Sequence, residues 1–377
     1  MHNTIMEEQR RSAVIRDFQR QVFCLFGLPV DNLDLAATKA LLRDKAGEQG
    51  EAVLSTINVN WVVQSRRDPA FRAAILNSEM VTLDGRPLVW LARLLGYPMK
   101  EVVAGSTLIQ ELNDDTVAEA PLGIFFFGGD DQAGRLAVEQ VNRSGGGLRA
   151  LGALNPGFGS IDEMSSPAII KRINEARPDI LLVALGAQKG VAWIEHNRHV
   201  LQAKVISHLG ATVNFLAGTV RRAPRIFRNM GLEWAWRIFQ EPKLFKRYGG
   251  DGLLLLRMLL SRLPLWLRYR SWQKQYGGQQ QTGNSTWQDD AQGLTLLLGP
   301  VLRAEHDQSL RDLLCRAALA QQDLSLDFQA TRFMDGAFLG LLLLLQKHQQ
   351  RNGKKLTFCH TRGRVAQIFH LFGMPRT

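Results

Sequence analysis

The chain has 377 residues, and its 46 Lys and Arg against 35 Asp and Glu give a formal net charge of +11. Hydrophobic residues make up 45% and charged residues 21% of the sequence, which excludes a disordered, collagen-like or coiled-coil chain. The length allows two or three domains.

Both the first residues and the apolar stretches favour a chain that stays in the cytoplasm. The first 21 residues carry charges of both signs and lack the apolar core of a secretory signal. The longest apolar stretch, residues 253–267, is interrupted by Arg257, Arg262 and Pro264, so no transmembrane span is expected. The three cysteines are widely spaced without a zinc-ligand pattern, which suits a reducing compartment.

Six β-rich apolar runs alternate with helical stretches between about Phe18 and Gly218. They read VLSTINVNWVV, MVTLDG, LGIFFFGG, LRALGAL, ILLVALGA and KVISHLGA. Alternation of this kind predicts a parallel sheet with crossover helices. Several runs end in Gly or a small polar residue, and open parallel sheets bind ligands outside the carboxyl ends of their strands. We therefore expect a nucleotide-type ligand at that edge.

Asp84 ends the second run and is the sharpest candidate for chemistry. A carboxylate at the end of a strand can face a ligand and act as a general base, although Asp-Gly is also ordinary turn chemistry. Thr56 and Asn58 end the first run, and residues i and i+2 of a strand share a face. The alternative for this pair is that both side chains only satisfy loop backbone groups. His208, near the end of the last run, is interpreted as structural.

The turn after the third run contains Gly128 and Gly129 and resembles a phosphate-binding loop, but it lacks the GxGxxG pattern. Asp130 and Asp131 follow, and adjacent acids on a turn favour solvation over metal binding, so no metal site is predicted. The sequence contains no Walker A, GxSxG, HExxH or CxxC motif. P-loop, serine hydrolase, zincin and thiol-redox chemistry therefore lack motif support.

Nearly all the excess positive charge lies between Thr219 and Lys274, where 13 Lys or Arg accompany three acids. The same segment holds four of the eight tryptophans and a leucine-rich stretch from Leu253 to Leu267. Such a segment suits a nucleic-acid backbone or an anionic membrane surface. The leucines favour the membrane, so no nucleic-acid partner is predicted. A helical hairpin packed on its own domain or on a second subunit is the alternative.

Residues 276–290 are rich in Gly, Gln and Ser without periodicity, which predicts a linker. Beyond it, strands are expected at LTLLL, LSLDF and KLTFCH, with helices near 306–321, 337–350 and 364–372. The pattern predicts a small second α/β domain. The expected division is a core at 1–218, a basic appendage at 219–275, the linker at 276–290 and the small domain at 291–377.

A series of motifs extends from about Leu25 to Tyr269. They read LFGLPVDNLDL, TINVNWV, LDGRPLVWLARLLGYP, VAGSTLIQEL, LGIFFFGG, NPGFGS, RPDILLVALGA, FLAGTVRRAPRIFRNMGLEWAWRIFQEP and FKRY. In this order they resemble the WecG/TagA/CpsF glycosyltransferase family. The block with RAP, GLEW and QEP is the most specific, because three such motifs rarely occur in sequence by chance.

The resemblance implies a Rossmann-like inverting glycosyltransferase, peripheral on the cytoplasmic face of the membrane, that needs no cofactor and no metal. It implies transfer from a UDP-sugar to a polyprenyl-diphosphate-linked acceptor in exopolysaccharide or similar surface-glycan synthesis. Asp84 would be the base, with Thr56 and Asn58 in the active site and Arg237 and Arg247 completing it from the appendage. The other expected substrate-binding residues are Gly128, Gly129, Gly157, Phe158, Gly186 and Lys189.

Some family positions differ in this sequence. The active-site Gln of the family motif GAPKQE is replaced by Gly190, and the Arg and Asp of RVAGSDL are replaced by Val102 and Thr107. The Asp of FDFLAG is replaced by Asn214. The leading interpretation is an active transferase. The alternative is a catalytically degenerate transferase fold kept as a scaffold that recruits a partner through its C-terminal domain.

The segment LSLDFQATRFMDGAFLGLLLLLQKHQQRNGKKLTFCH resembles a STAS domain. The regulatory Ser that follows the conserved Asp of such domains is Gly336 here, after Asp335, which excludes phosphorylation at that position. The resemblance implies a module that docks a protein partner, and a domain that only stabilises the chain or a dimer is the alternative. The sequence leaves the oligomeric state open, since a tail covering its own active site and one packed on a second copy look alike.

Overall fold

The computed structural model describes most of the chain. The described residues are 2–47, 51–116, 120–220, 223–224, 227, 230–276, 285–290, 293–305 and 307–374. They form two compact units. The central unit comprises Leu33–Arg93 and Met99–Leu254, and the terminal unit comprises Met1–Asn32, Leu94–Pro98 and Leu255–Thr377. Each unit thus draws on segments that are distant in sequence, and neither follows the expected linear division.

The central unit contains a six-stranded, fully parallel sheet with the strand order β4-β3-β8-β7-β5-β6. Its strands are β3 (Ala52–Ile57), β4 (Met80–Leu83), β5 (Leu122–Gly128), β6 (Leu148–Leu154), β7 (Ile180–Ala184) and β8 (Val205–His208). Each of the six apolar runs supplies one strand, which confirms the predicted α/β sheet. The first run is only half strand, because Asn58 accepts a hydrogen bond from the Trp61 amide and so begins a helix.

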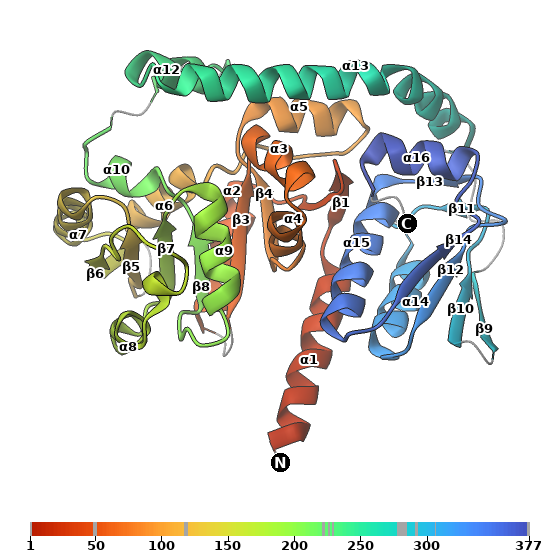
Figure 1. Cartoon of the computed structure of the whole chain (residues 1–377), viewed down its shortest axis with the longest axis horizontal. Helices are drawn as coiled ribbons and strands as arrows, with labels where there is room; N and C mark the ends of the chain where they lie inside the picture. The colour runs from red at the N-terminus through yellow and green to blue at the C-terminus, as the bar shows by residue number, and fades with distance from the viewer. Residues whose placement is uncertain are drawn as a thin grey trace. The chain divides into compact units, whose positions relative to one another are not determined.

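Helices cover both faces of this sheet (Figure 1). They are α2 (Leu35–Gly47), α3 (Val59–Arg67), α4 (Pro69–Leu76), α5 (Arg86–Leu94), α6 (Gly105–Asn113), α7 (Asp131–Ser144), α8 (Pro167–Ala176), α9 (Ala187–Asn197) and α10 (Thr212–Leu216), with a 3-10 turn at Glu163–Ser165. Strand β5 shows why two layers are needed. Ile124 and Phe126 belong to the core shared with α6 and α7, whereas Phe125 and Phe127 pack with Trp193 of α9. Successive side chains of a strand point to opposite faces, so both faces are apolar.

Most of the described residues of the basic segment are helical. It forms α12 (Glu233–Gln240) and the 33-residue α13 (Leu244–Tyr276), which continues through Pro264. Several of the large apolar side chains on these helices are exposed. Searched over the described residues, no helix is both long enough and apolar enough to cross a membrane.

The terminal unit combines the start and the end of the chain. Its elements are α1 (His2–Gln19), β1 (Val22–Leu25), β2 (Leu28–Asp31), β9 (Thr286–Asp290), β10 (Gly293–Leu297), β11 (Val301–Leu302), α14 (Gln308–Leu319), β12 (Leu324–Asp327), β13 (Phe333–Met334), α15 (Gly336–Arg351), β14 (Leu356–Cys359) and α16 (Arg364–Phe372). The main sheet has the order β14-β12-β10-β9, and β1 and β2 form a hairpin. The three strands and three helices predicted for the small domain are all present.

Strand β9 corrects the predicted linker. Residues 286–290, expected to lie in the linker at 276–290, pair antiparallel with β10, with Trp287 opposite Leu296. An edge strand is held mainly by backbone hydrogen bonds to one neighbour, so it needs no alternating apolar pattern that sequence analysis would detect. The linker residues 277–284 lie outside the described residues.

Candidate functional site

Asp84 lies at the carboxyl end of β4, in a backbone position fixed by its neighbours. Its amide donates a 2.8 Å hydrogen bond to the carbonyl of Ile57 at the end of β3. The next residue, Gly85, has a φ of +114°, a conformation that L side chains rarely adopt, and it turns the chain into α5. The half-buried Asp84 carboxylate is therefore carried by a rigid strand end beside a second strand end.

Thr56 and Asn58 lie on the adjacent strand end but differ in environment. Thr56 is buried within β3, opposite Thr82 of β4. Asn58 is half-buried, and its side-chain oxygen accepts from the Trp61 amide at 3.3 Å. Part of the Asn58 side chain therefore caps α3, which is the alternative expected from the sequence, namely that this side chain satisfies backbone groups.

The N-terminus of α6 borders the same edge, a feature that the sequence analysis did not predict. The amide of Val103 donates to the Leu83 carbonyl at 3.0 Å, and the Thr82 hydroxyl donates to the Val103 carbonyl at 3.2 Å. Gly105, the first residue of α6, has no space for a side chain because Leu209, just after β8, lies against it. In the sequence, the small residues at the start of this apolar helix are the signal that could have indicated the close approach of Gly105 and Leu209.

The glycines expected to bind substrate lie at the ends of the other strands. Gly128 ends β5 and Gly129 follows it, with φ values of +89° and +79°. Asp130 then caps α7, accepting from the amides of residues 132 and 133 at 2.9 and 3.1 Å. A helix cap is thus its role in the structure.

The loop after β6 is tied to the start of α9. Gly157 has a φ of +78°, and Phe158 in the same loop is fully exposed. Gly186 is the N-cap of α9, and the ammonium of Lys189 donates to the Gly159 carbonyl at 2.9 Å. These residues lie beyond the carboxyl ends of the neighbouring strands β5, β6 and β7, so the structure places them along one sheet edge.

Position 190 is glycine for a steric reason. The imidazole of His208, at the end of β8, occupies the space that a side chain at Gly190 would need. The Nε2 atom of His208 is hydrogen-bonded to the Leu185 carbonyl, and burial lowers the pKa of the imidazole, which keeps it neutral. The absence of a glutamine at Gly190 is therefore accompanied by a polar ring that fills its place, and His208 has the structural role expected of it.

Two contacts hold the basic segment of the central unit against elements of the site. The side-chain amide of Asn60, two residues after Asn58, donates to Asp251 of α13 at 2.9 Å. Gly231, before α12, lies so close to Arg86 that a Cβ there would be 3.1 Å from the Arg86 Cβ. Arg86 follows Asp84 by two residues.

The two appendage arginines differ in exposure. Arg237 on α12 is half-buried, and its Nε atom has no hydrogen-bond partner among the described residues. Arg247 on α13 is exposed, with its guanidinium 5.2 Å from the centre of the Tyr248 ring. Among the described residues, no group of three or more His, Cys, Asp and Glu side chains could hold a metal ion.

A parallel sheet with helices on both faces, glycine turns and a carboxylate at its carboxyl edge defines a Rossmann-like domain. Residues 23–268 match the protein-family model described as "Glycosyl transferase WecG/TagA/CpsF family". The chain belongs to this family. Residues 285–376 match the description "Mlab, STAS domain", so a STAS domain follows the transferase region, as the sequence motifs indicated.

Two curated relatives from Bacillus carry the same name, N-acetylglucosaminyldiphosphoundecaprenol N-acetyl-beta-D-mannosaminyltransferase. The protein of Bacillus spizizenii is 26% identical over 196 residues, which is 52% of this chain and 74% of the relative. The protein of Bacillus subtilis is 25% identical over 196 residues, which again cover 52% of this chain and 74% of the relative. Both are proteins to which this chain is similar.

Proposed function

We propose that this protein is a peripheral membrane glycosyltransferase that moves a sugar from a UDP-sugar to a polyprenyl-diphosphate-linked acceptor in surface-glycan biosynthesis. Family membership and the names of the two relatives, which act on a diphosphoundecaprenol-linked sugar, support the acceptor class. The observation that carries the proposal is the position of Asp84 at the carboxyl end of β4, held against β3. Release of UDP that depends on a lipid-diphosphate acceptor tests it.

The proposed reaction is a single displacement. Asp84 accepts the proton of an acceptor hydroxyl as its oxygen attacks the anomeric carbon, and the bond from that carbon to the UDP oxygen breaks. The configuration inverts, UDP leaves with the bonding electron pair, and the proton remains on Asp84 until solvent takes it. Backbone amides at the strand-end glycines and the guanidinium groups of Arg237 and Arg247 would stabilise the charge that develops on the diphosphate.

We propose that this charge stabilisation needs no divalent cation. The expected result is that EDTA leaves the rate of UDP release within about twofold of its untreated value, because cationic side chains and backbone dipoles can take the role of a metal at a diphosphate. Initial rates with EDTA, and with EDTA followed by excess Mg²⁺ or Mn²⁺, provide the check. Loss of turnover that is restored by either cation would contradict this part of the mechanism.

The membrane contact is proposed to involve α13. Leucines spaced three and four residues apart share one side of a helix, and five such leucines on α13 are between 47% and 69% exposed. They are Leu253, Leu256, Leu260, Leu263 and Leu267. Exposed Arg257, Arg268 and Arg270 on the same helix supply positive charge. An exposed apolar stripe accompanied by arginines suits the boundary between anionic headgroups and acyl chains.

Replacing Leu256, Leu260 and Leu263 together by glutamine should weaken binding to vesicles that contain an anionic lipid by about tenfold or more, because three apolar side chains no longer enter the acyl boundary. Co-sedimentation with such vesicles measures the change. Val200→Gln, which alters an apolar side chain that is 56% exposed outside α12 and α13, is the matched control and should bind as the wild type does. Unchanged binding of the triple variant would place the membrane contact elsewhere.

A further inference from the structure

The described residues of the STAS domain between 285 and 374, here called the C-terminal module, pack unusually closely on the N-terminal hairpin Val22–Asp31. Gly340 in α15 faces the hairpin backbone: a Cβ at this position would be 2.8 Å from the Val22 carbonyl oxygen and 3.0 Å from the Phe23 Cα. A Cβ at Gly373, after α16, would be 2.8 Å from the Phe26 carbonyl carbon. Real Cβ atoms do not approach backbone this closely, so two glycines of the module make room for one hairpin.

A third glycine accommodates a tyrosine from another segment. Gly336 begins α15, and the phenol of Tyr97 occupies the space where a side chain at Gly336 would lie. Tyr97 is buried, and its hydroxyl donates to the Cys24 carbonyl of β1. Its ring centre lies 4.9 Å from that of Phe23 and 6.0 Å from that of Phe372. Burial raises the pKa of the phenol, which keeps it protonated as a donor.

The end of α13 packs against the same module. The Tyr269 ring stacks on Phe333 with a 5.6 Å centroid separation, and its hydroxyl donates to the Met334 carbonyl at 3.4 Å. The Arg364 guanidinium lies 4.7 Å from the Trp272 ring centre and donates to the Tyr276 hydroxyl at 2.9 Å. These contacts attach the last turns of α13 to β13 and α16.

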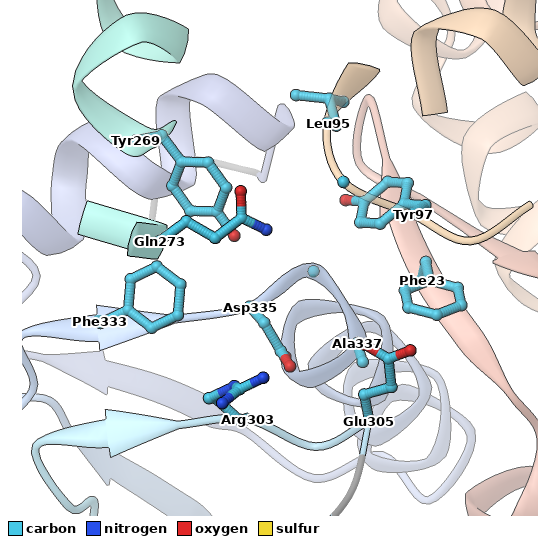
Figure 2. A pocket seen from close by; sticks show the side chains of 12 residues that line it. Phe23, Leu95, Tyr97, Tyr269, Gln273, Arg303, Glu305, Phe333, Asp335 and Ala337 are labelled. Carbon is cyan, nitrogen blue, oxygen red and sulfur yellow. The ribbon is translucent and has the colours of Figure 1, made fainter. Parts of the chain in front are cut away.

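The cavity between these contacts is small. Figure 2 shows Tyr97 and Phe23 on one side of it, Tyr269 and Phe333 on the other, and Asp335 between them. Its volume is about 50 Å³, enough for one or two water molecules and far below the 300 Å³ or more of an ordinary ligand pocket. The cavity is therefore a packing gap between closely fitted segments.

Helix α1 is joined to the module by buried charges. The Asp17 carboxylate contacts the ammonium of Lys347 and the Nε2 atom of His348, each at 2.9 Å. Arg20 bridges Asp17 and Asp31 at 2.9 and 2.8 Å. Buried ion pairs are rare, and they persist where each charge has a fixed partner.

We propose that the C-terminal module is the binding partner of two other segments of its own unit, which it binds through the space beside Gly336, here called the socket. The occupant is the chain itself: the hairpin Val22–Asp31 and the segment Leu94–Pro98, with Tyr97 as the residue that enters the socket. The position expected to carry a regulatory serine is thus used as a fixed contact. In the sequence, Leu94–Pro98 joins α5, which follows Asp84, to the loop before α6. The proposal does not depend on the transfer reaction.

A double-mutant cycle on the full-length protein tests the socket. Gly336→Ala alone should lower the unfolding midpoint by about 3–8 °C, because its methyl group and the Tyr97 phenol compete for one space. In the Tyr97→Ala background, where the phenol is gone, the same substitution should leave the midpoint unchanged or raise it. Gly252→Ala, at a helical glycine with nothing within 4 Å of a Cβ, is the control for helix propensity. Equal losses in both backgrounds would overturn the proposal.

Hydrogen exchange of the full-length Gly336→Ala protein supplies a second readout. Loss of amide protection should appear in three places together: the N-terminal turn of α15, residues Val22–Leu25 and residues Leu95–Tyr97. The strands of the central sheet should keep their protection. Faster exchange confined to α15 would show that the hairpin and the 94–98 segment do not depend on the socket. Neither measurement uses a sugar donor, so failure here and failure of the proposed function are distinguishable.

Discussion

Asp84→Asn is expected to reduce acceptor-dependent UDP release by about 10²- to 10⁴-fold, the range contributed by a general base. Asparagine has nearly the size of aspartate and keeps one acceptor oxygen, but its amide cannot take the proton from an acceptor hydroxyl. The backbone contact of Asp84 with Ile57 uses the amide and not the side chain, so the fold should persist. Initial rates at saturating donor, measured beside the unfolding midpoint, separate a catalytic loss from misfolding.

Asp131→Asn is the matched control for this variant. Asp131 is a second carboxylate at the carboxyl edge of the sheet, exposed in the first turn of α7, and we assign it no role in the reaction. Its replacement should leave the rate within about twofold, since the substitution removes only a solvated surface charge. Wild-type rates from a folded Asp84→Asn protein would remove Asp84 from the mechanism and favour the scaffold interpretation.

Asp17→Asn is expected to cause the largest loss of stability, about 3–5 kcal/mol in the free energy of unfolding. Asp17 is 5% exposed, and Lys347 beside it is 1% exposed. Removing the carboxylate charge leaves Lys347 and Arg20 with one buried countercharge fewer, which costs more than the exchange of a surface pair. Urea unfolding of the full-length protein measures the difference. Glu175→Gln, which removes the exposed ion pair with Lys171, should produce no measurable change, and a comparable loss there would contradict this account.

The same contribution depends on pH in a defined direction. Burial acts to raise the pKa of Asp17, but Lys347, His348 and Arg20 together hold it well below its ordinary value of 3.8. A carboxylate with a lower pKa in the folded state stabilises the protein above the unfolded value. This stabilisation is lost as the pH falls through the folded value. The difference in stability between wild type and Asp17→Asn should therefore stay constant near neutral pH and shrink in acid below about pH 4.

The central sheet could be predicted from the sequence because its strands are buried on both faces. In β5, neighbouring residues such as Phe126 and Phe127 enter different cores, and the result is a continuous apolar run that is visible in the sequence. Asp84 could be proposed for the same reason, since the end of such a run marks the edge where parallel sheets bind ligands. Local patterns of this kind depend on residues that are close in sequence.

The features that escaped prediction depend on contacts between distant residues. Nothing near Gly336 in the sequence indicates that Tyr97 fills its side-chain space, and nothing near Gly190 indicates the ring of His208. The membership of Met1–Asn32 in the terminal unit has the same cause, because buried Lys347 and His348 contact Asp17, which lies more than 300 residues earlier in the chain. Periodicity in the sequence carries no information on such pairings.

The pairing of Gly190 with His208 also changes how the departures from the family pattern are understood. Counted from the sequence alone, glycine at this position is one lost polar contact. In the structure, a neutral imidazole occupies the space and keeps a polar group beside the carboxyl end of β7. We therefore interpret the glycine at this position as a result of local packing against His208.

The most direct test of the proposed function is UDP release by the purified wild-type protein, measured with a panel of UDP-sugars and a short-chain lipid-diphosphate-linked sugar. At least one UDP-sugar should release UDP at a rate that rises with acceptor concentration and saturates. The product should contain the transferred sugar. A folded, vesicle-binding protein that releases no UDP above background across the panel would contradict the assignment as a UDP-sugar transferase.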